Sequence, residues 1–341
     1  MISLNEIMSY LKNYDGEPIS IMEVCGTHTS SIAKLGIKSV ISDKIKLVSG
    51  PGCPVCVTVS EYIDRLCELS KSENNVIVSF GDMLRVKGSA ESLEDAKASG
   101  GDVQMVYSPF EVLKLADENK DKTYIFAAVG FETTTPIYAM LIEKVIEQKI
   151  TNIKILTSLK TMPNPIEWIC EKNSNVSGFI APGHVSVITG SEIFEGIANE
   201  YNVPFVVAGF SSEQILCAIY SLIKLRNQGK VLNLYKSAVN TNPNENSKAL
   251  VEKYFYPYDA SWRGIGNIPL SGLYLKDEFL EYDAGSVGLV QDNHFNPLCK
   301  CSEILIGKAS PSDCQLFKKV CTPQNPQGAC MVSVEGACHN F

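Results

Sequence analysis

Short apolar runs alternate with helix-like segments over the first two thirds of the chain. The runs cover residues 18–24, 44–50, 75–81, 124–131, 153–159, 177–182 and 204–210. Segments with helical periodicity separate several of them, at residues 59–71, 135–148 and 211–225. Strands that are apolar on both faces are typical of parallel sheets covered by helices. The alternation predicts an α/β fold with two parallel-sheet units, residues 1–122 and 123–235.

The pattern changes near residue 230, where Gly, Pro, Tyr and Cys become more frequent. Residues 261–279 look irregular and are expected to pack on the α/β body. The third unit, residues 236–341, ends in a cysteine-rich tail with too few aliphatic residues for a core of its own. A metal centre is therefore expected to supply the stability that this small unit lacks.

Charge and hydropathy exclude several classes of partner. The net charge is −8 and there is no basic cluster, so we expect no nucleic-acid partner. No run of 18 apolar residues occurs, so we expect no membrane span. The first twenty residues contain acidic side chains and no long apolar core, which argues against a signal or transit peptide. The expected location is the cytoplasm.

Twelve cysteines are many for a cytoplasmic chain of this size. A reducing cytosol disfavours a permanent disulfide framework, so metal binding or transient redox chemistry is the better interpretation. Half of these cysteines fall in the last 43 residues: Cys299, Cys301, Cys314, Cys321, Cys330 and Cys338. The tail is therefore the strongest chemical signal in the sequence.

Chemically unusual residues follow the predicted strands. These segments are residues 25–30, 50–56, 81–86, 130–136 and 182–190, which contain Cys, His, Glu, Thr and Gly. Ligands of parallel α/β sheets bind outside the carboxyl ends of the strands. We therefore expect these loops to face one shared site. None of them matches a nucleotide-binding glycine motif.

The two cysteines of the "GPGCPVC" stretch, Cys53 and Cys56, allow three interpretations. A C-x-x-C at a helix start favours thiolate, so redox or iron chemistry ranks first. Half of a tetrahedral zinc site ranks second, because Cys25 and His28 form a C-x-x-H that would complete it. Ordinary buried cysteines rank third, because the stretch reads as a loop.

In the tail, Cys299, Cys314, Cys321 and Cys338 are separated by 14, 6 and 16 residues. Four thiolates can hold a [4Fe–4S] cluster if the fold brings them together. Cys301 and Cys330 would then remain as a redox pair beside it. Spacing alone does not select four of the six, and zinc stays a competitor.

Other candidates carry weaker signals. Glu132 follows an apolar strand and is a candidate for proton transfer, although the adjacent threonines also fit a helix cap. His184 lies beside a Pro-Gly turn that would expose it toward the same cleft. Core packing is expected for Cys67, Cys170 and Cys217, and only surface or local hydrogen-bonding roles for His294 and His339.

Five motifs occur together and in this order: "CGTHT", "GPGCPVC", "GFETTTP", "PGHVSVITG" and "CTPQNPQGACMVSVEGAC". This combination closely resembles the HypD family of hydrogenase maturation proteins over essentially the whole chain. The resemblance implies two Rossmann-like domains and a C-terminal [4Fe–4S] domain. It also implies a scaffold on which the Fe(CN)2CO group of [NiFe]-hydrogenase is assembled, with a HypC-type chaperone and the cyanide donor HypE as partners.

The resemblance also implies roles for individual residues. Cys25 would bind the transient Fe(CN)2CO iron, with His28 beside it and with Glu132 and His184 lining the same space. Cys53 and Cys56 would form the redox pair of the cleft. In the tail, the family pattern points to Cys299, Cys314, Cys321 and Cys338 as cluster ligands and to Cys301 and Cys330 as a redox-active pair.

Three functions therefore compete at this point. The first is the maturation scaffold with redox activity. The second is a cluster-dependent thiol–disulfide oxidoreductase that acts on a protein substrate through Cys53 and Cys56. The third is a zinc-stabilised binding module without redox chemistry.

Overall fold

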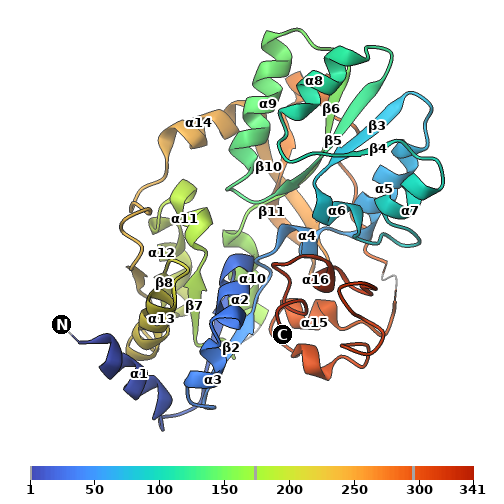
Figure 1. The fold of residues 1–341 in the computed structure, drawn as a ribbon. Coiled ribbons are helices and arrows are strands. Elements are labelled where there is room, and N and C mark those ends of the chain that lie inside the picture. Colours follow the sequence, from blue (N-terminus) through green and yellow to red (C-terminus); the bar gives the residue numbers. More distant parts are fainter. Residues whose placement is uncertain (1, 173–174, 294–295) are drawn as a thin grey trace.

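A computed structural model describes residues 2–172, 175–293 and 296–341 (Figure 1). The strands are β1 (Ile19–Glu23), β2 (Ile45–Ser49), β3 (Asn75–Ser79), β4 (Val103–Met105), β5 (Thr123–Gly130), β6 (Ile153–Lys160), β7 (Gly178–Ala181), β8 (Phe205–Val207), β9 (Val231–Asn233), β10 (Phe255–Trp262) and β11 (Gly266–Leu275). The α-helices of the two lobes are α1 (Leu4–Lys12), α2 (Gly26–Lys34), α3 (Ile37–Val40), α4 (Pro54–Val57), α5 (Ser60–Ser70), α6 (Gly81–Leu84), α7 (Leu93–Ala98), α8 (Glu111–Glu118), α9 (Thr135–Glu147), α10 (Pro163–Lys172), α11 (Gly183–Thr189), α12 (Glu195–Tyr201), α13 (Ser212–Lys224) and α14 (Glu245–Tyr254). The tail adds α15 (Cys301–Leu305) and α16 (Ala329–Val332), and the short 3₁₀ helices are η1 (Glu192–Phe194), η2 (Asp277–Tyr282) and η3 (Pro311–Asp313).

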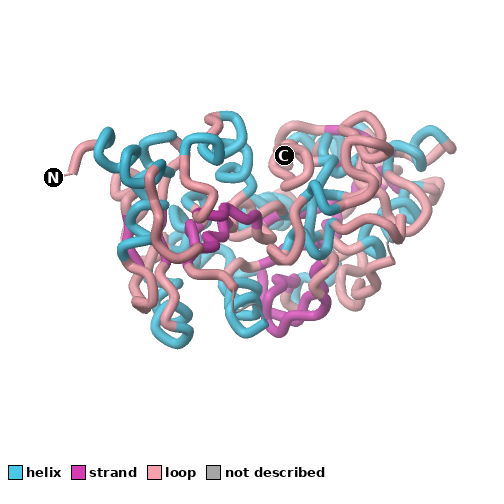
Figure 2. Tube along the Cα trace, turned by 90° about the horizontal axis from the view of Figure 1, so that it is seen from below, coloured by secondary structure: helices cyan, strands magenta, loops and turns pink. Residues whose placement is uncertain are grey.

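The strands form two sheets, one in each lobe. The first, which we call sheet A, has the order β2-β1-β7-β8-β9, and all its pairs are parallel. The second, sheet B, has the order β10-β11-β6-β5-β3-β4, with parallel pairing among β3 to β6 and an antiparallel β10–β11 hairpin at one edge. The α/β fold with two parallel-dominated sheets is therefore confirmed. Figure 2 shows the two lobes side by side in an elongated molecule.

Each sheet is covered on both faces, which explains the nearly continuous apolar runs. In β7, Ile180 packs with α1 and α13 on one face of sheet A, whereas Phe179 and Ala181 pack with α10, α12 and the tail on the other. Sheet B is buried by α8, α9 and α14 on one face and by α5 and α7 on the other. Successive side chains of a strand point to opposite faces, so a strand buried on both sides needs apolar residues throughout.

The chain divides between the lobes differently from the predicted units 1–122 and 123–235. Sheet A takes its strands from residues 19–49 and 178–233, and sheet B from residues 75–160 and 255–275. The chain thus crosses between lobes three times, after β2, β6 and β9. Residues 255–275, expected in the third unit and partly as irregular structure, instead add a hairpin to sheet B. Apolar periodicity identifies a strand but does not say which strands become its neighbours.

The cysteine-rich tail lies against both lobes, beside α4 (Figure 1). It shares the core of sheet A through residues such as Cys301 and Met331, and its Ala329 and Val332 pack into the core of sheet B. The tail thus packs between the two lobes and shares their cores, which agrees with the expectation that it cannot build a core alone. No helix in the described ranges is long and apolar enough to cross a membrane.

Candidate functional site

Cys25 lies two positions after the end of β1 and is the N-cap residue just before α2. As N-cap it has an extended backbone, with φ −146° and ψ 120°. The side chain is buried, and this burial is the main reason why the pKa of Cys25 rises to about 12. Nearby Glu335 and Glu23 also raise this pKa, whereas backbone hydrogen bonds from His28 and Thr27 lower it. The helix start therefore offers two N–H donors to a sulfur whose burial favours the protonated thiol.

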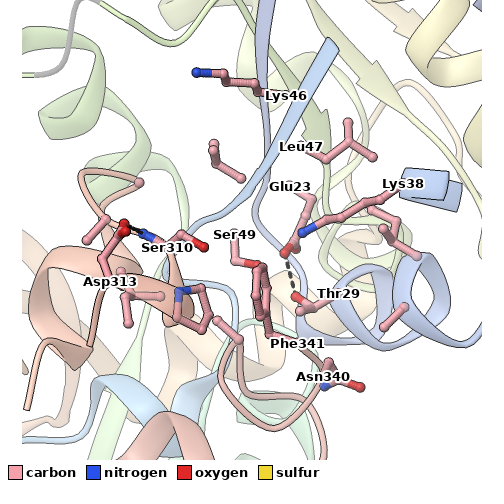
Figure 3. A pocket seen from close by; sticks show the side chains of 18 of the residues that line it. Glu23, Thr29, Lys38, Lys46, Leu47, Ser49, Ser310, Asp313, Asn340 and Phe341 are labelled. Carbon is pink, nitrogen blue, oxygen red and sulfur yellow. Dashed lines mark hydrogen bonds between the residues drawn. The ribbon is translucent and has the colours of Figure 1, made fainter. Parts of the chain in front are cut away.

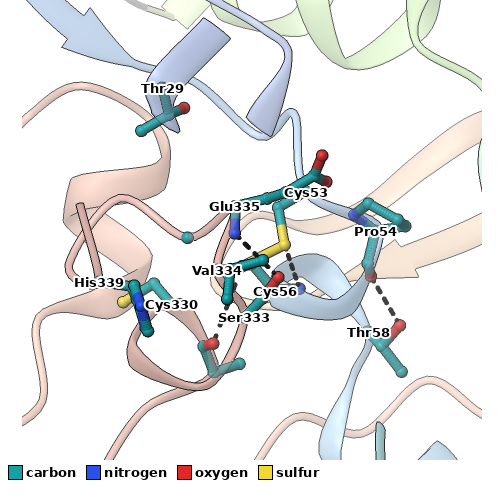
Figure 4. Close-up of a disulfide and its surroundings, with 12 residues drawn as sticks. Thr29, Cys53, Pro54, Cys56, Thr58, Cys330, Ser333, Val334, Glu335 and His339 are labelled. Atoms are coloured by element: carbon teal, nitrogen blue, oxygen red, sulfur yellow. Dashed lines mark hydrogen bonds between the residues drawn. A yellow bond between two sulfur atoms is a disulfide. The ribbon is translucent and has the colours of Figure 1, made fainter. Parts of the chain in front are cut away.

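Cys53 and Cys56 form a disulfide, with their Cα atoms 5.2 Å apart (Figure 4). Cys53 is the N-cap of α4, and Pro54 takes the first helical position, where a missing N–H costs no hydrogen bond. The Cys56 N–H donates to Cys53 Sγ at 3.3 Å. This bonded pair is consistent with the redox interpretation of the C-x-x-C.

Gly52 holds the disulfide loop against the Cys25 loop. A Cβ atom at Gly52 would lie only 2.3 Å from the backbone N of Cys25 and from the backbone C of Val24. The Gly26 N–H donates to the Gly52 carbonyl at 3.0 Å. Because only glycine permits so close an approach, this residue fixes the distance between two of the predicted thiol groups.

The tail docks on both loops. The Thr27 hydroxyl donates to Glu335 at 2.7 Å, and a Cβ atom at Gly26 would lie 2.4 Å from the Cβ of Glu335. Cys56 Sγ lies 3.8 Å from the carbonyl oxygen of Ala329, the residue before Cys330. Figure 4 shows Glu335 beside the disulfide. All three predicted groups of thiols therefore meet where sheet A, α4 and the tail come together.

The six tail cysteines gather in one apolar region. Cys330 Sγ lies 3.1 Å from Cys338 Sγ. A side-chain hydrogen bond to Cys330, together with burial, raises the pKa of Cys301 well above its ordinary value. A Cβ atom at Gly328 would lie 2.5 Å from Cys299 Sγ and 3.9 Å from Cys301 Sγ. Cys330 thus contacts both its expected partner Cys301 and Cys338, which the resemblance assigns to a cluster.

The six tail cysteines are the residue type that holds iron–sulfur clusters, but their side chains are not arranged as a metal site in this structure. Cys314 and Cys321 complete the set, and all six side chains are free thiols in the core that the tail shares with sheet A. Four thiolates of one chain can hold a [4Fe–4S] centre. Among the described residues, no three Cys, His, Asp or Glu side chains form a group that could hold a metal ion.

His28 and His184 both contact the ring of Phe210, which follows β8. The ring centroids of His28 and Phe210 are 4.6 Å apart, and those of His184 and Phe210 are 4.3 Å apart. His28 is fully buried, and its Nε2 donates to the Gly209 carbonyl at 3.1 Å, which leaves Nδ1 unprotonated. Burial lowers the pKa of His28 to about 4. These two predicted residues therefore meet at the carboxyl edge of sheet A.

Glu132 lies elsewhere, after β5 of sheet B. Its Oε1 accepts the Met162 N–H at 2.8 Å, its buried Oε2 has no hydrogen-bond partner among the described residues, and burial raises its pKa to about 7. It lines a cavity of about 480 Å³ whose described lining includes neither Cys25 nor His184. The predicted loops thus divide between two sheets: those after β1, β2 and β7 share one edge, and those after β3 and β5 belong to the other.

Glu23, the last residue of β1, was not singled out from the sequence. Its carboxylate accepts the Cys25 N–H at 3.2 Å and the Thr29 hydroxyl, and burial raises its pKa to about 7. A carboxylate inside an otherwise apolar strand, two positions before a cysteine, is the signal that could have identified it.

The remaining cysteines and histidines follow the predictions where the structure describes them. Cys67 is buried in the core of sheet B, and Cys170 and Cys217 pack against the cores on either face of sheet A. His339 Nδ1 lies 3.2 Å from the Met331 carbonyl, a local hydrogen bond. His294 lies outside the described residues.

Comparison with known proteins decides the family. A family model described as "HypD: Hydrogenase formation hypA family" matches residues 3–341. The chain belongs to the HypD family. The hydrogenase maturation factor HypD of Rhizobium leguminosarum is 38% identical over 333 residues, covering 93% of this chain and 86% of the relative. HypD of Escherichia coli is 36% identical, covering 98% and 91%. A putative hydrogenase expression/formation protein of Methanocaldococcus jannaschii is 37% identical, covering 95% and 92%.

Proposed function

We propose that this HypD-family chain is the scaffold on which the Fe(CN)2CO group of [NiFe]-hydrogenase is assembled. The observation that supports the proposal most is the convergence of three thiol groups. Gly52 holds the Cys53–Cys56 loop against Cys25, and the Thr27–Glu335 hydrogen bond seats the tail on both. Cysteines that only stabilise a core do not have to converge at the edge of a sheet.

The iron is the substrate of this reaction, and Cys25 is its anchor on the chain. Cyanide and CO favour low-spin iron, for which a thiolate is a suitable soft donor. The thiol proton of Cys25 must leave when iron binds, and the N–H groups at the start of α2 then stabilise the sulfur's negative charge. A HypC-type chaperone would share the iron, and HypE would deliver the cyanide.

The tail would hold a resident [4Fe–4S] cluster through Cys299, Cys314, Cys321 and Cys338. When bound, such a cluster supplies one-electron transfer. The protein's own thiols account for a further redox step. Cys301 and Cys330 are free thiols, whereas Cys53 and Cys56 are joined. Exchange would form a Cys301–Cys330 disulfide and return two electrons and two protons to Cys53 and Cys56.

The decisive experiment is anaerobic co-purification with the HypC-type chaperone, followed by infrared spectroscopy. The wild-type complex should show bands of metal-bound cyanide and CO. Cys25→Ala should abolish both the bands and the retained iron, while Cys217→Ala, a cysteine that packs against the core, should keep them. Wild-type bands in Cys25→Ala would refute the anchor.

The cluster is tested separately on the chain alone. Cys299→Ser should lose the broad absorbance near ~400 nm that is typical of thiolate-bound iron–sulfur centres, and Cys301→Ser should retain it. The Cys53–Cys56 disulfide of the C-x-x-C also supports a second candidate function, a cluster-dependent thiol–disulfide oxidoreductase for a protein substrate. Metal-bound cyanide and CO in the wild-type complex would exclude that alternative.

A further inference from the structure

A cavity of about 540 Å³ lies between sheet A and the tail (Figure 3). Four consecutive residues of β2 line it, numbers 46–49, opposite residues 307–311 of the tail. Successive side chains of a strand point to opposite faces of the sheet. A cavity that touches all four must therefore follow the edge of the strand. β2 is the terminal strand of sheet A, so this edge is the edge of the sheet.

The hydrogen bonds to β1 show which backbone groups of β2 face the cavity. Ile19 N–H donates to the Lys44 carbonyl at 2.9 Å, and Gly50 N–H donates to the Glu23 carbonyl at 2.7 Å. In a parallel pair, alternate residues of one strand bond to the same neighbour. The even-numbered residues of β2 therefore face β1, and the backbone groups of Leu47 and Ser49 point away from it. Such an edge can pair with an added strand.

The cavity is basic although the protein is acidic. Three exposed lysines line it, Lys38, Lys46 and Lys308, against one exposed acid among the described lining residues, Asp313. The net charge of the whole chain is −8. The other acid, Glu23, is buried and already accepts hydrogen bonds from neighbouring hydroxyl and N–H groups. An acidic ligand would therefore be attracted to the rim.

We propose that this cavity docks an extended, acidic segment of a partner protein. The segment would pair with β2 as a sixth strand of sheet A, and its carboxylates would meet the three lysines. Main-chain pairing supplies affinity in this mode of recognition, and side-chain contacts supply selectivity. Because Glu23 lines the cavity and also accepts the Cys25 N–H, the added strand would lie beside the loop that carries Cys25. The proposal goes beyond the scaffold function and does not depend on it.

The test uses the full chain and two fluorescein-labelled octapeptides of alternating valine and glutamate. One is unmodified, and the other is N-methylated at every residue, so that neither edge of the peptide keeps N–H donors. The unmodified peptide should bind and should slow amide exchange at residues 45–49, but not in β9, the opposite edge of sheet A. The N-methylated peptide should bind at least about tenfold more weakly.

Charge variants separate strand pairing at this cavity from general attraction to lysine. Lys46→Glu combined with Lys308→Glu should weaken binding about tenfold. A matched double variant at exposed lysines outside the cavity, Lys97→Glu with Lys236→Glu, should change it less than about twofold. The proposal is overturned if the unmodified peptide does not bind, if N-methylation has no effect, if β9 is protected instead, or if both double variants lose affinity equally.

Discussion

The hydroxyl of Thr27 donates a hydrogen bond to the carboxylate of Glu335, 2.7 Å away and 308 positions further along the chain. The contact joins the first turn of α2, next to Cys25, to the tail segment between Cys330 and Cys338. Access to the Cys25 thiol therefore depends on how the tail is seated.

Thr27→Val removes this hydroxyl at nearly constant volume. A hydrogen bond to a charged group contributes about 1.5–3 kcal/mol, and partial exposure reduces this one to about 1–2 kcal/mol. We expect the free energy of unfolding to fall by that amount and alkylation of Cys25 by iodoacetamide to accelerate, measured by peptide mass spectrometry. Thr27→Ser, which keeps the hydroxyl, is the control. Equal alkylation rates in the wild type and Thr27→Val would show that the contact does not govern access.

Gly52→Ala should separate the disulfide loop from Cys25. Its Cβ atom would meet backbone atoms at 2.3 Å, so the loops must move apart. We expect stability to fall by about 1–3 kcal/mol, the range for overpacked sites, and iron to be lost from the chaperone complex. Gly196→Ala is the matched control, because its Cβ atom meets nothing within 4 Å. Iron retention by Gly52→Ala at the wild-type level would contradict the role of this contact.

His28 should remain neutral well into the acid range. Its pKa is lowered to about 4 because it is buried. The unfolded chain gains a proton below about pH 6.5 and the folded chain does not, so stability should fall by about 3 kcal/mol as the pH drops from 6.5 to 4. Long-range ¹H–¹⁵N spectra should show one tautomer, protonated at Nε2, from pH 8 to pH 5.5. A titration midpoint near the ordinary histidine value would refute this environment.

Lys160 gives a second test of the same sign, at alkaline pH. Its Nζ donates to the Ser261 carbonyl at 2.9 Å, and burial lowers its pKa to about 7, while the more distant Asp292 raises it. Between pH 7 and pH 10 the unfolded chain holds a proton that the folded chain has lost. Stability should therefore rise with pH in this window, by the order of a few kcal/mol. In urea unfolding, Lys160→Met should show a smaller rise of the free energy of unfolding with pH than the wild type. Parallel pH profiles for the two proteins would count against a neutral buried amine.

The strands and the loops that follow them were open to prediction because they depend on local chemistry. Val78 and Phe126, for example, belong to runs that only a strand buried on both faces explains. The assignment of strands to sheets was not predictable, since pairing β1 with β7 is a long-range choice that apolar periodicity does not encode. For the same reason the sequence could not show that Glu132 and Cys25 belong to different sheets.

The triple crossing between lobes also sets the order in which the protein can assemble during synthesis. β1 must wait for β7, which leaves the ribosome roughly 150 residues later, about ten to thirty seconds at ordinary elongation rates. Sheet B waits similarly for its closing hairpin, which follows all of sheet A. The cysteine-rich tail is synthesised after both sheets. Any metal that it takes up therefore binds to a chain whose two lobes have already formed.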